Sequence, residues 1–375
     1  MNQTLQVIDH VVPAIASLKP YIPGKPIDEL ERELGIRNII KLASNENPLG
    51  PSPMALEAVQ QASRDIGLYP DGSGFALKNR IAALHQVASS QITLGSGSSD
   101  PLEFVVRSFV RPGERVLFSQ YAFAIYPIIT HAAGGVAVAV PSRNWGYDLH
   151  ALAAAITSDT RVVFIANPNN PTGTWLGEHE LRQFLDRIPH DVLVVVDEAY
   201  YEYASFLTAE DRDPVPDCSR WLNDYPNLVV TRTFSKAYGL AGLRIGYSLS
   251  SVAIADMFNR IRPPFNVNSL ALRAAAAALD DADHLAKTLQ VNRDGRAQLM
   301  QGFSALGLKY IPTVGNFISV DLQQPAIPVY NALLHHGVIV RPIANYGMPN
   351  YLRITIGLAD QNQRLLEGLK QILQG

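Results

Sequence analysis

Short runs of branched apolar residues recur through the middle of the chain and alternate with segments of helical spacing. The runs are rich in valine and isoleucine and lie at residues 115–118, 136–140, 161–165, 192–196 and 228–230. Helical spacing occupies the intervening residues 100–109, 149–155 and 178–187. Continuous rather than alternating apolar runs are typical of parallel strands covered by helices on both faces. The pattern therefore predicts a large α/β domain over about residues 45–265.

The pattern of apolar residues changes after the Pro-Pro pair at 263–264. An alanine-rich helix is expected to begin near Ser269, and apolar runs at 338–340 and 352–356 predict strands flanked by helices. This arrangement is typical of a smaller α+β domain, which we assign to residues 266–375.

The first residues of the chain, 1–44, are predicted to form an arm that belongs to the smaller domain. Their proline-rich stretch at 19–26 favours extended backbone. No signal-peptide pattern is expected, because Asp9 and His10 interrupt the short apolar stretch near the start. No apolar run approaches the roughly 20 residues of a membrane helix. We therefore expect a cytoplasmic protein that does not bind a membrane.

Composition narrows the class of protein further. The chain has 375 residues, of which 47% are hydrophobic and 17% charged, a balance that is usual for a protein with a sizeable core. The formal net charge of −3 gives no electrostatic reason to expect nucleic acid as a partner. With one cysteine, Cys218, the chain forms no internal disulfide, which fits a reducing compartment.

Ligands of open α/β sheets bind at the carboxyl ends of the strands, so polar segments that follow predicted strands are candidate ligand sites. One of them reads Leu-Gly-Ser-Gly-Ser-Ser-Asp-Pro at 94–101 and precedes an apolar helix pattern. Asp100 is a candidate N-cap, with Pro101 at the first helical position. Glycines and serines at such a place expose backbone N–H groups and hydroxyls that suit a phosphate. An ordinary helix start explains the segment equally well.

Two further polar segments follow predicted strands. Asn-Pro-Asn-Asn-Pro-Thr-Gly at 167–173 has the residues of a turn, but a turn does not require the whole ordered string. Asp-Glu-Ala-Tyr at 197–200 places Asp197 at the end of a buried run, where a carboxylate is costly without a cation or donor. A helix N-cap is the simpler interpretation of Asp197, and a partner for a protonated ring nitrogen is the functional one.

The segment at 231–246 carries Lys236 among small and apolar residues. A lysine is usually a solvated surface charge. In these surroundings the charged amine is disfavoured and its pKa is lowered. That is the condition for an amine that attacks a carbonyl group and forms a Schiff base.

Taken together, three of these strings resemble the fold-type I pyridoxal-phosphate aminotransferases: Asn-Asn-Pro-Thr-Gly, Asp-Glu-Ala-Tyr and Ser-Lys-Ala-Tyr-Gly-Leu-Ala-Gly-Leu-Arg, in this order and spacing. A closer resemblance, to the histidinol-phosphate aminotransferase family, covers nearly the whole chain. It extends through Tyr-Ile-Pro-Gly-Lys-Pro at 21–26, Leu-Ala-Ser-Asn-Glu-Asn-Pro-Leu-Gly at 42–50, Tyr-Pro-Asp-Gly at 69–72 and Leu-Arg-Ile at 352–354. The resemblance implies a mainly parallel seven-stranded sheet with helices on both faces, plus the smaller α+β domain.

The resemblance also implies roles around the cofactor ring. Lys236 would hold pyridoxal 5′-phosphate as a Schiff base and later move a proton between the substrate Cα and the cofactor. Asp197 would keep the pyridinium nitrogen protonated, so that the ring can accept electrons. Asn170 and Tyr200 would hydrogen-bond the phenolic oxygen, and Tyr121 would stack on the ring.

The implied phosphate site combines Ser98 and Ser99 with Ser235 and Arg244, whose planar cation suits an anion. Tyr69 would reach the phosphate of the neighbouring subunit's cofactor, which implies a homodimer with shared sites.

The implied substrate site lies on the smaller domain. Arg341 and Arg353 would grip the anionic end of the substrate, together with Tyr21 and Asn47. Arg353 has the better claim because it falls in a predicted strand, whereas Arg341 could be a structural cation. The chain departs from many relatives at 118–121, where Phe-Ser-Gln-Tyr stands in place of a Pro-Thr-Tyr pattern.

The function implied is transamination of L-histidinol phosphate with 2-oxoglutarate, giving imidazole acetol phosphate and glutamate in histidine biosynthesis. Two guanidiniums suit a doubly charged phosphate, but either alone would suit an α-carboxylate. A broad-specificity aromatic amino-acid aminotransferase is therefore an alternative, and a phospho-amino-acid decarboxylase on the same fold is a more distant one.

Other classes of enzyme fit the sequence poorly. A nicotinamide dehydrogenase would need a third glycine where Asp100 stands. A metal site is not expected, because no His-Glu-x-x-His or equivalent spacing occurs.

Overall fold

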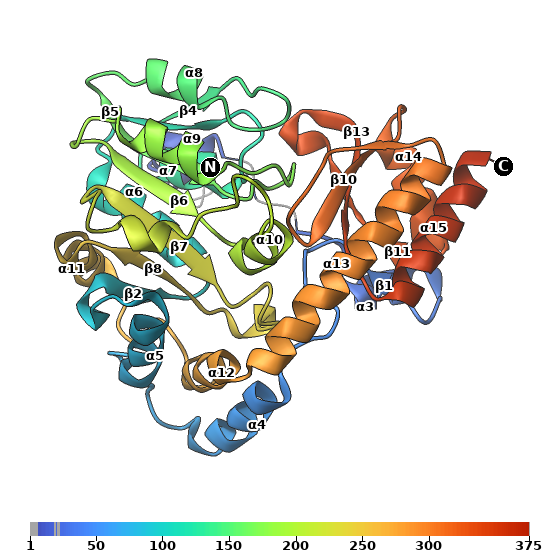
Figure 1. The fold of residues 1–375 in the computed structure, drawn as a ribbon, viewed down its shortest axis with the longest axis horizontal. Coiled ribbons are helices and arrows are strands. Elements are labelled where there is room, and N and C mark those ends of the chain that lie inside the picture. Colours follow the sequence, from blue (N-terminus) through green and yellow to red (C-terminus); the bar gives the residue numbers. More distant parts are fainter. Residues whose placement is uncertain (1–6, 19, 21–22, 375) are drawn as a thin grey trace.

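A seven-stranded sheet forms the centre of the larger part of the molecule (Figure 1). The computed structural model describes residues 7–18, 20 and 23–374. In spatial order the strands are β2 (Ile92–Gly95), β8 (Gly246–Ser250), β7 (Leu228–Thr233), β6 (Leu193–Asp197), β5 (Thr160–Ala166), β3 (Arg115–Ser119) and β4 (Val136–Val140). β8 runs antiparallel to both of its neighbours, β2 and β7, and the other neighbouring strands of this sheet pair in parallel. The predicted α/β fold with a mainly parallel seven-stranded sheet is confirmed.

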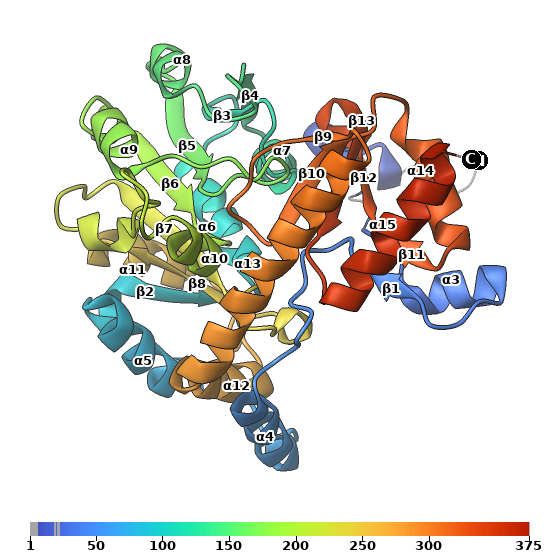
Figure 2. The same cartoon turned by 45° about the vertical axis from the view of Figure 1, so that its right-hand side comes forward.

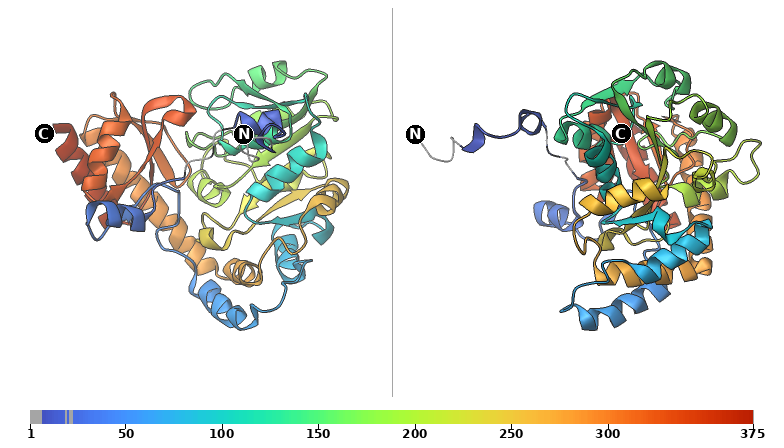
Figure 3. Two further views of the ribbon diagram at one scale, coloured as in Figure 1. Left: turned by 180° about the vertical axis from the view of Figure 1, so that it is seen from behind. Right: turned by 90° about the vertical axis from the view of Figure 1, so that its left-hand side faces the viewer.

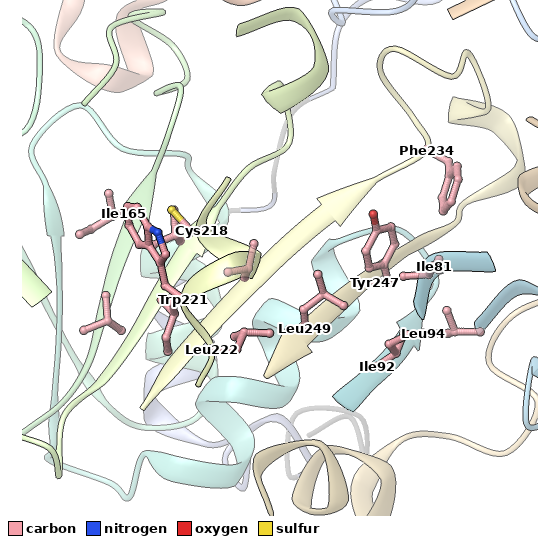
Figure 4. Packing of buried hydrophobic residues seen from close by; sticks show 14 of the residues in the cluster. Ile81, Ile92, Leu94, Ile165, Cys218, Trp221, Leu222, Phe234, Tyr247 and Leu249 are labelled. Carbon is pink, nitrogen blue, oxygen red and sulfur yellow. The ribbon is translucent and has the colours of Figure 1, made fainter. Parts of the chain in front are cut away.

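Helices cover both faces of this sheet, which explains why the predicted strands carry continuous apolar runs. One face packs against α5 (Phe75–His85), α8 (Leu149–Ala154), α9 (Glu178–Leu185) and α12 (Ser269–Asp280). The other packs against α6 (Ser99–Phe109), α7 (Ile125–Ala132) and α11 (Val252–Ile261). Figure 4 shows part of the first core, where Tyr247 and Leu249 of β8 meet Ile92 and Leu94 of β2. All five predicted strands and the three predicted helices are confirmed, with ends shifted by a few residues.

The apolar pattern of the sequence did not predict strands β2 and β8. Strand β8 reads Gly-Tyr-Ser-Leu-Ser, in which apolar and polar residues alternate over too short a length to stand out. Its first residue, Gly246, lies so close to the start of α6 that an added Cβ would be 2.4 Å from the Ser98 nitrogen. A glycine is therefore needed where β8 passes the loop that precedes α6.

The start of α6 corrects one prediction. Asp100 is not the N-cap: the helix begins at Ser99, and Ser98 occupies the capping position. The Asp100 carboxylate instead accepts a hydrogen bond from the Ser96 N–H at 2.8 Å, which folds the loop back on itself. The serine pair lies at the N-terminal end of the helix and is half-buried.

The helical region after the Pro-Pro pair begins at Ser269 as predicted, but it divides in two. α12 ends at Asp280, and α13 (Ala282–Ala305) runs from the large sheet to the smaller domain (Figure 2). α12 packs on α4 (Pro53–Ala62) and shares the core of the large sheet. The domain limits at 45–265 and 266–375 stay predictions, and we infer from this packing that the boundary lies nearer to the start of α13.

The smaller domain is built on an antiparallel sheet of β12 (Arg341–Ile343), β13 (Met348–Thr355), β10 (Phe317–Asp321) and β9 (Lys309–Tyr310). Its core includes side chains of α13, α14 (Ala326–His335) and α15 (Ala359–Gln374). The N-terminal region joins this domain through α3 (Ile27–Leu34) and through β1 (Ile40–Lys41), which pairs in parallel with β11 (Val338–Ile339).

Before α3, residues 7–18 run past α7 and out from the body of the molecule (Figure 3). They include α2 (Pro13–Ala16) and expose Val7, Ile8 and Val12 to solvent by 71%, 61% and 55%. Over the described part of the chain, no helix combines the length and the apolar character that spanning a membrane requires.

Candidate active site

A cavity of about 180 Å³ opens where β5, β6 and β7 end, between the large sheet and the smaller domain. The structure brings together here most of the predicted site residues, namely Ser98, Ser99, Asn170, Asp197, Tyr200, Ser235, Lys236, Arg244, Arg341 and Arg353. They come from loops far apart in the sequence, so their convergence is a result of the fold.

Lys236 lies in the connection between β7 and β8 and extends its amine into the cavity. Its Nζ donates a hydrogen bond to the Ser44 carbonyl at 3.0 Å. Burial, together with the nearby Arg353 guanidinium, lowers the pKa of Lys236 to about 7. A large fraction of the amine is therefore uncharged and nucleophilic near neutral pH.

Asp197 is the last residue of β6 and is only 5% exposed. One carboxylate oxygen accepts from the Thr231 hydroxyl at 2.9 Å and the other from the Tyr126 hydroxyl at 2.9 Å. Burial raises the pKa of Asp197, and these two hydrogen bonds oppose that rise. Tyr126 was missed from the sequence, because on α7 it has the pattern of a core aromatic and its ring does stack on Phe164.

Tyr200 sits among amide groups at the start of α10 (Tyr201–Leu207). Its hydroxyl oxygen accepts from Asn45 Nδ2 at 2.9 Å and from Asn170 Nδ2 at 3.2 Å. Burial raises the pKa of Tyr200 to about 12, so the hydroxyl keeps its proton and can donate it to an oxygen in the cavity. Asn45 was also missed as a site residue, although its positive φ of 55° marks an unusual backbone position.

One end of the cavity has the donors of a phosphate site. Ser98 and Ser99 stand at the N-terminus of α6, where the helix dipole favours an anion. Opposite them, Arg244 Nη1 donates to the Ser235 hydroxyl at 3.3 Å. A Cβ added to Gly97 would meet the Arg244 guanidinium at 2.5 Å, so glycine allows the cation to lie over the helix start.

The opposite wall is formed by two arginines of the smaller domain. Arg341 and Arg353 are register partners on β12 and β13, so their guanidiniums reach the cavity from adjacent strands. Arg353 is 7% exposed and donates to Asn170 Oδ1 at 2.6 Å and to the Ala43 carbonyl at 2.9 Å. Both acceptors are neutral, and the Arg353 Nε has no partner among the described residues.

The charge balance of the lining follows from these positions. The cationic lining side chains are Arg244, Arg341 and Arg353, together with the charged fraction of Lys236, against the carboxylate of Asp197. Like charges on neighbouring strands are destabilising unless an anion offsets them. The cavity is therefore suited to a ligand, or a pair of ligands, with more than one anionic group.

Three predicted residues lie away from the lining. Asn47 donates its amide to the Ala237 carbonyl at 2.9 Å and to the Thr288 hydroxyl at 3.1 Å, contacts that tie the Lys236 loop to α13. Tyr69 is 83% exposed and stacks on Phe265. The ring of Tyr121 packs against Trp145, outside the cavity lining. The fourth, Tyr21, lies outside the described residues.

Besides Tyr200, the aromatic side chain among the described residues that lines the cavity is Phe123, two residues after Tyr121. The sequence offered a weak signal for it, since the departure from the usual Pro-Thr-Tyr pattern fell just before this position. Within the described ranges, no group of three or more histidine, cysteine, aspartate or glutamate side chains is arranged to hold a metal ion.

The residues gathered here fit pyridoxal phosphate. An uncharged lysine amine suits its aldehyde, a buried carboxylate suits its ring nitrogen, and the helix N-terminus with Arg244 suits its phosphate. The donor at Tyr200 suits the phenolic oxygen.

Comparison with known proteins agrees with this chemistry. Residues 37–369 match the family model described as aminotransferase class I and II, and the chain belongs to that family. More particularly, the chain is 57% identical to histidinol-phosphate aminotransferase 2 of Pseudomonas aeruginosa, over 96% of this chain and 97% of that protein. It is 53% identical to histidinol-phosphate aminotransferase 1 of Nitrosococcus oceani, over 96% of each chain. The resemblance drawn from the motifs is confirmed.

Solved structures give the same result for the fold. The histidinol-phosphate aminotransferase of Sinorhizobium meliloti, in complex with pyridoxal-5′-phosphate, aligns with a TM-score of 0.88 and 31% identity. That alignment covers 97% of this chain and 98% of the other. The aspartate aminotransferase of Thermus thermophilus with maleate has a TM-score of 0.82 at 19% identity, covers 97% of this chain and 99% of the other, and shares the fold.

Proposed function

We propose that this chain transfers the amino group of L-histidinol phosphate to 2-oxoglutarate, giving imidazole acetol phosphate and glutamate in histidine biosynthesis. Pyridoxal 5′-phosphate is the cofactor. The observation that carries the proposal is the pair Arg341 and Arg353, whose guanidiniums share one cavity with Lys236. Two guanidiniums fit a phosphate dianion, and relatives at 57% and 53% identity are named for the same substrate.

The cofactor would be held at both ends. Lys236 would bond to the aldehyde carbon, and Ser98, Ser99, Ser235 and Arg244 would hold the phosphate. When bound, the cofactor supplies an electron sink for the substrate carbon that loses its proton.

The residues around the ring set its charge and its position. Asp197, fixed by Thr231 and Tyr126, would keep the ring nitrogen protonated. Tyr200 would donate its hydroxyl proton to the phenolic oxygen. We assign the stacking contact to Phe123 in place of Tyr121, since Phe123 lines the cavity.

Lys236 would also move the proton. Its amine, with a pKa of about 7, can take a proton from the substrate Cα and return it without a large energetic penalty at neutral pH. Lys236 is partly buried, which limits competing reactions with water at its amine.

The substrate-binding step distinguishes this proposal from its alternatives. A single guanidinium would satisfy the α-carboxylate of an aromatic amino acid, whereas the phosphate of histidinol phosphate can use both. The test compares kcat/KM for histidinol phosphate, phenylalanine and tyrosine, with 2-oxoglutarate as acceptor. A higher value for the aromatic amino acids would replace the proposal with the broad-specificity alternative. Release of carbon dioxide from a phosphorylated amino acid would favour the decarboxylase.

A homodimer is part of the proposal. Exposed apolar side chains occur on the N-terminal segment and around Tyr69, including Val7, Ile8, Ile66, Leu68 and Phe75. Burying them against a second copy would be favourable, and it could bring Tyr69 to the partner's phosphate site. Light scattering in solution tests the dimer. We place the enzyme in the cytoplasm, which cell fractionation tests.

A further inference from the structure

A buried cluster of charges lies behind the active-site strands and has no part in the function proposed above. Arg232 of β7 donates to Glu198 Oε2 through Nε at 2.8 Å and Nη2 at 2.6 Å. Its Nη2 also reaches Asp217 Oδ1 at 2.7 Å. The side chains of Arg232 and Glu198 are 5% and 0% exposed, and the second Glu198 oxygen accepts from the Cys218 N–H.

Stability alone does not explain such a cluster. Removing two charges from water costs about as much as their attraction returns, and apolar residues of similar size often serve a core equally well. A buried ion pair is more selective than an apolar contact, because it is satisfied in one geometry only. The position of this pair in the sheet indicates which geometry it fixes.

The pair lies one residue beyond the contact that holds Asp197. β6 and β7 are parallel, with Asp197 opposite Thr231 in the register. Side chains of successive strand residues point to opposite faces. Thus the Thr231 hydroxyl bonds to Asp197 on the cavity face, and Arg232 bonds to Glu198 on the other. The Glu198 N–H also donates to the Thr231 carbonyl at 2.9 Å.

Hydrogen bonds also connect the cluster to β8, the strand that follows the Lys236 loop. Asp217 accepts from the Ser219 hydroxyl at 2.6 Å, and Ser219 bonds to His85 Nδ1 at 3.0 Å. His85 Nε2 bonds to the Tyr247 hydroxyl at 2.9 Å, and Tyr247 is the register partner of Arg232 on β8. Figure 4 shows Tyr247 on β8 close to Phe234 at the end of β7. The end of β7 is therefore linked to the residue that follows β6 and to β8, immediately before Lys236 in the chain.

We propose that Glu198 and Arg232 are positioning residues, whose ion pair fixes the ends of β6 and β7 so that Asp197 and Lys236 keep the relative placement that pyridoxal phosphate requires. The proposal rests on the cofactor part of the proposed function and does not depend on which amino donor the enzyme prefers.

The experiment measures cofactor binding by Glu198→Gln, Arg232→Gln, the double variant and Arg232→Lys. Cofactor-free protein is titrated with pyridoxal phosphate, and the visible band of the loaded protein is followed against pH. The matched control is Arg220→Gln, because Arg220 is 79% exposed and approaches the same Asp217 at 3.7 Å. Thermal unfolding of the cofactor-free variants is recorded alongside.

We expect each glutamine variant to raise the dissociation constant of pyridoxal phosphate by about 10- to 100-fold, as loss of an outer-shell partner does at metal sites. The pH midpoint of the visible band should shift with it. The double variant should lose little more than the larger single change, because the two residues act as one unit. Arg232→Lys, which keeps the charge, should recover part of the affinity.

The proposal would be overturned if the glutamine variants unfolded at a lower temperature but bound pyridoxal phosphate with the same affinity and the same pH midpoint as the Arg220→Gln control. The ion pair would then have a structural role only. Should Arg232→Gln fail to fold, Glu198→Gln and Arg232→Lys still decide between these outcomes. Failure of the proposed function has a different signature: an unaltered protein that binds no pyridoxal phosphate, or one that prefers another substrate.

Discussion

The two walls of the cavity differ in how their polar groups are partnered. On the large-sheet wall, both oxygens of Asp197 accept hydrogen bonds, and the strand ends are bonded on both faces. On the small-domain wall, Arg353 meets only neutral acceptors, and its Nε has no partner among the described residues. The first wall is already complete for a group that stays bound. The second retains positive charge for an anion that arrives and leaves with each turnover.

Removing the lysine tests the first wall and has the largest expected effect. Lys236→Ala should lower kcat by about 10⁴-fold or more, because it removes both the covalent attachment and the proton carrier. The protein incubated with pyridoxal phosphate should lose its visible absorption band and its borohydride sensitivity. Lys41→Ala is the matched control, since Lys41 is a nearby lysine that pairs with Glu46 at 2.8 Å. A band that persists in Lys236→Ala would place the attachment elsewhere.

Substitution of the two arginines on the second wall should lower kcat/KM by unequal amounts. Arg353→Gln should lower kcat/KM for histidinol phosphate by about 10²–10³-fold, the effect of losing a buried charged partner. Arg341→Gln should cost about tenfold, because this guanidinium is less buried and exposed charges contribute less. Both losses should appear mainly in KM, as measured by steady-state kinetics. Equal, small effects would move the anion to another part of the cavity.

Substitution of Phe123, the proposed stacking residue, should have a smaller effect, which appears in the affinity for the cofactor. Phe123→Leu should raise the dissociation constant of pyridoxal phosphate by about tenfold, since an aromatic contact contributes about 0.5–1.5 kcal/mol beyond its buried area. Tyr121→Leu should change it less than threefold, because that ring packs on Trp145 instead. Absorbance titration of both variants measures the difference. The reverse order of effects would restore Tyr121 as the stacking residue.

The last prediction concerns the pH dependence of cofactor binding and needs no substitution. With the pKa of Lys236 lowered to about 7, the uncharged amine prevails above neutrality. The rate at which cofactor-free protein binds pyridoxal phosphate covalently should rise about tenfold per pH unit below 7 and level off above it. Stopped-flow absorbance measures this rate, and a free lysine derivative provides the reference. A rate that continues to rise to pH 10, like the reference, would show that the amine is not perturbed.

The sequence predicted the first wall better than the second, for a physical reason. Asp197, Tyr200, Lys236 and Arg244 belong to short contiguous strings that end or follow apolar runs, so strand periodicity and motif locate them together. Arg341 and Arg353 meet through the register of two antiparallel strands, a long-range pairing that periodicity does not fix. Their charge made them candidates, and the family resemblance rather than the pattern gave them a role.

Other features depend on packing that a sequence cannot display. Tyr126 and Asn45 reach the site through side-chain geometry, and both have the pattern of core or loop residues. The break between α12 and α13 at Asp281 was missed because both segments are helical and no proline or glycine separates them. The capping error at Asp100 arose because the carboxylate bonds backward to the loop rather than forward to the helix.

The antiparallel strand β8 has a consequence for the size of the cofactor. Because Thr233 pairs with Gly246, the loop between them is closed at its base, and it carries both Lys236 and Arg244. In the proposed function, Lys236 would bond to the aldehyde of the cofactor and Arg244 would hold its phosphate. Because both residues lie on this one loop, the loop would set the distance between the two ends of the bound molecule. A pyridoxal analogue whose phosphate arm is longer or shorter by one carbon would then reach Lys236 or Arg244, but not both.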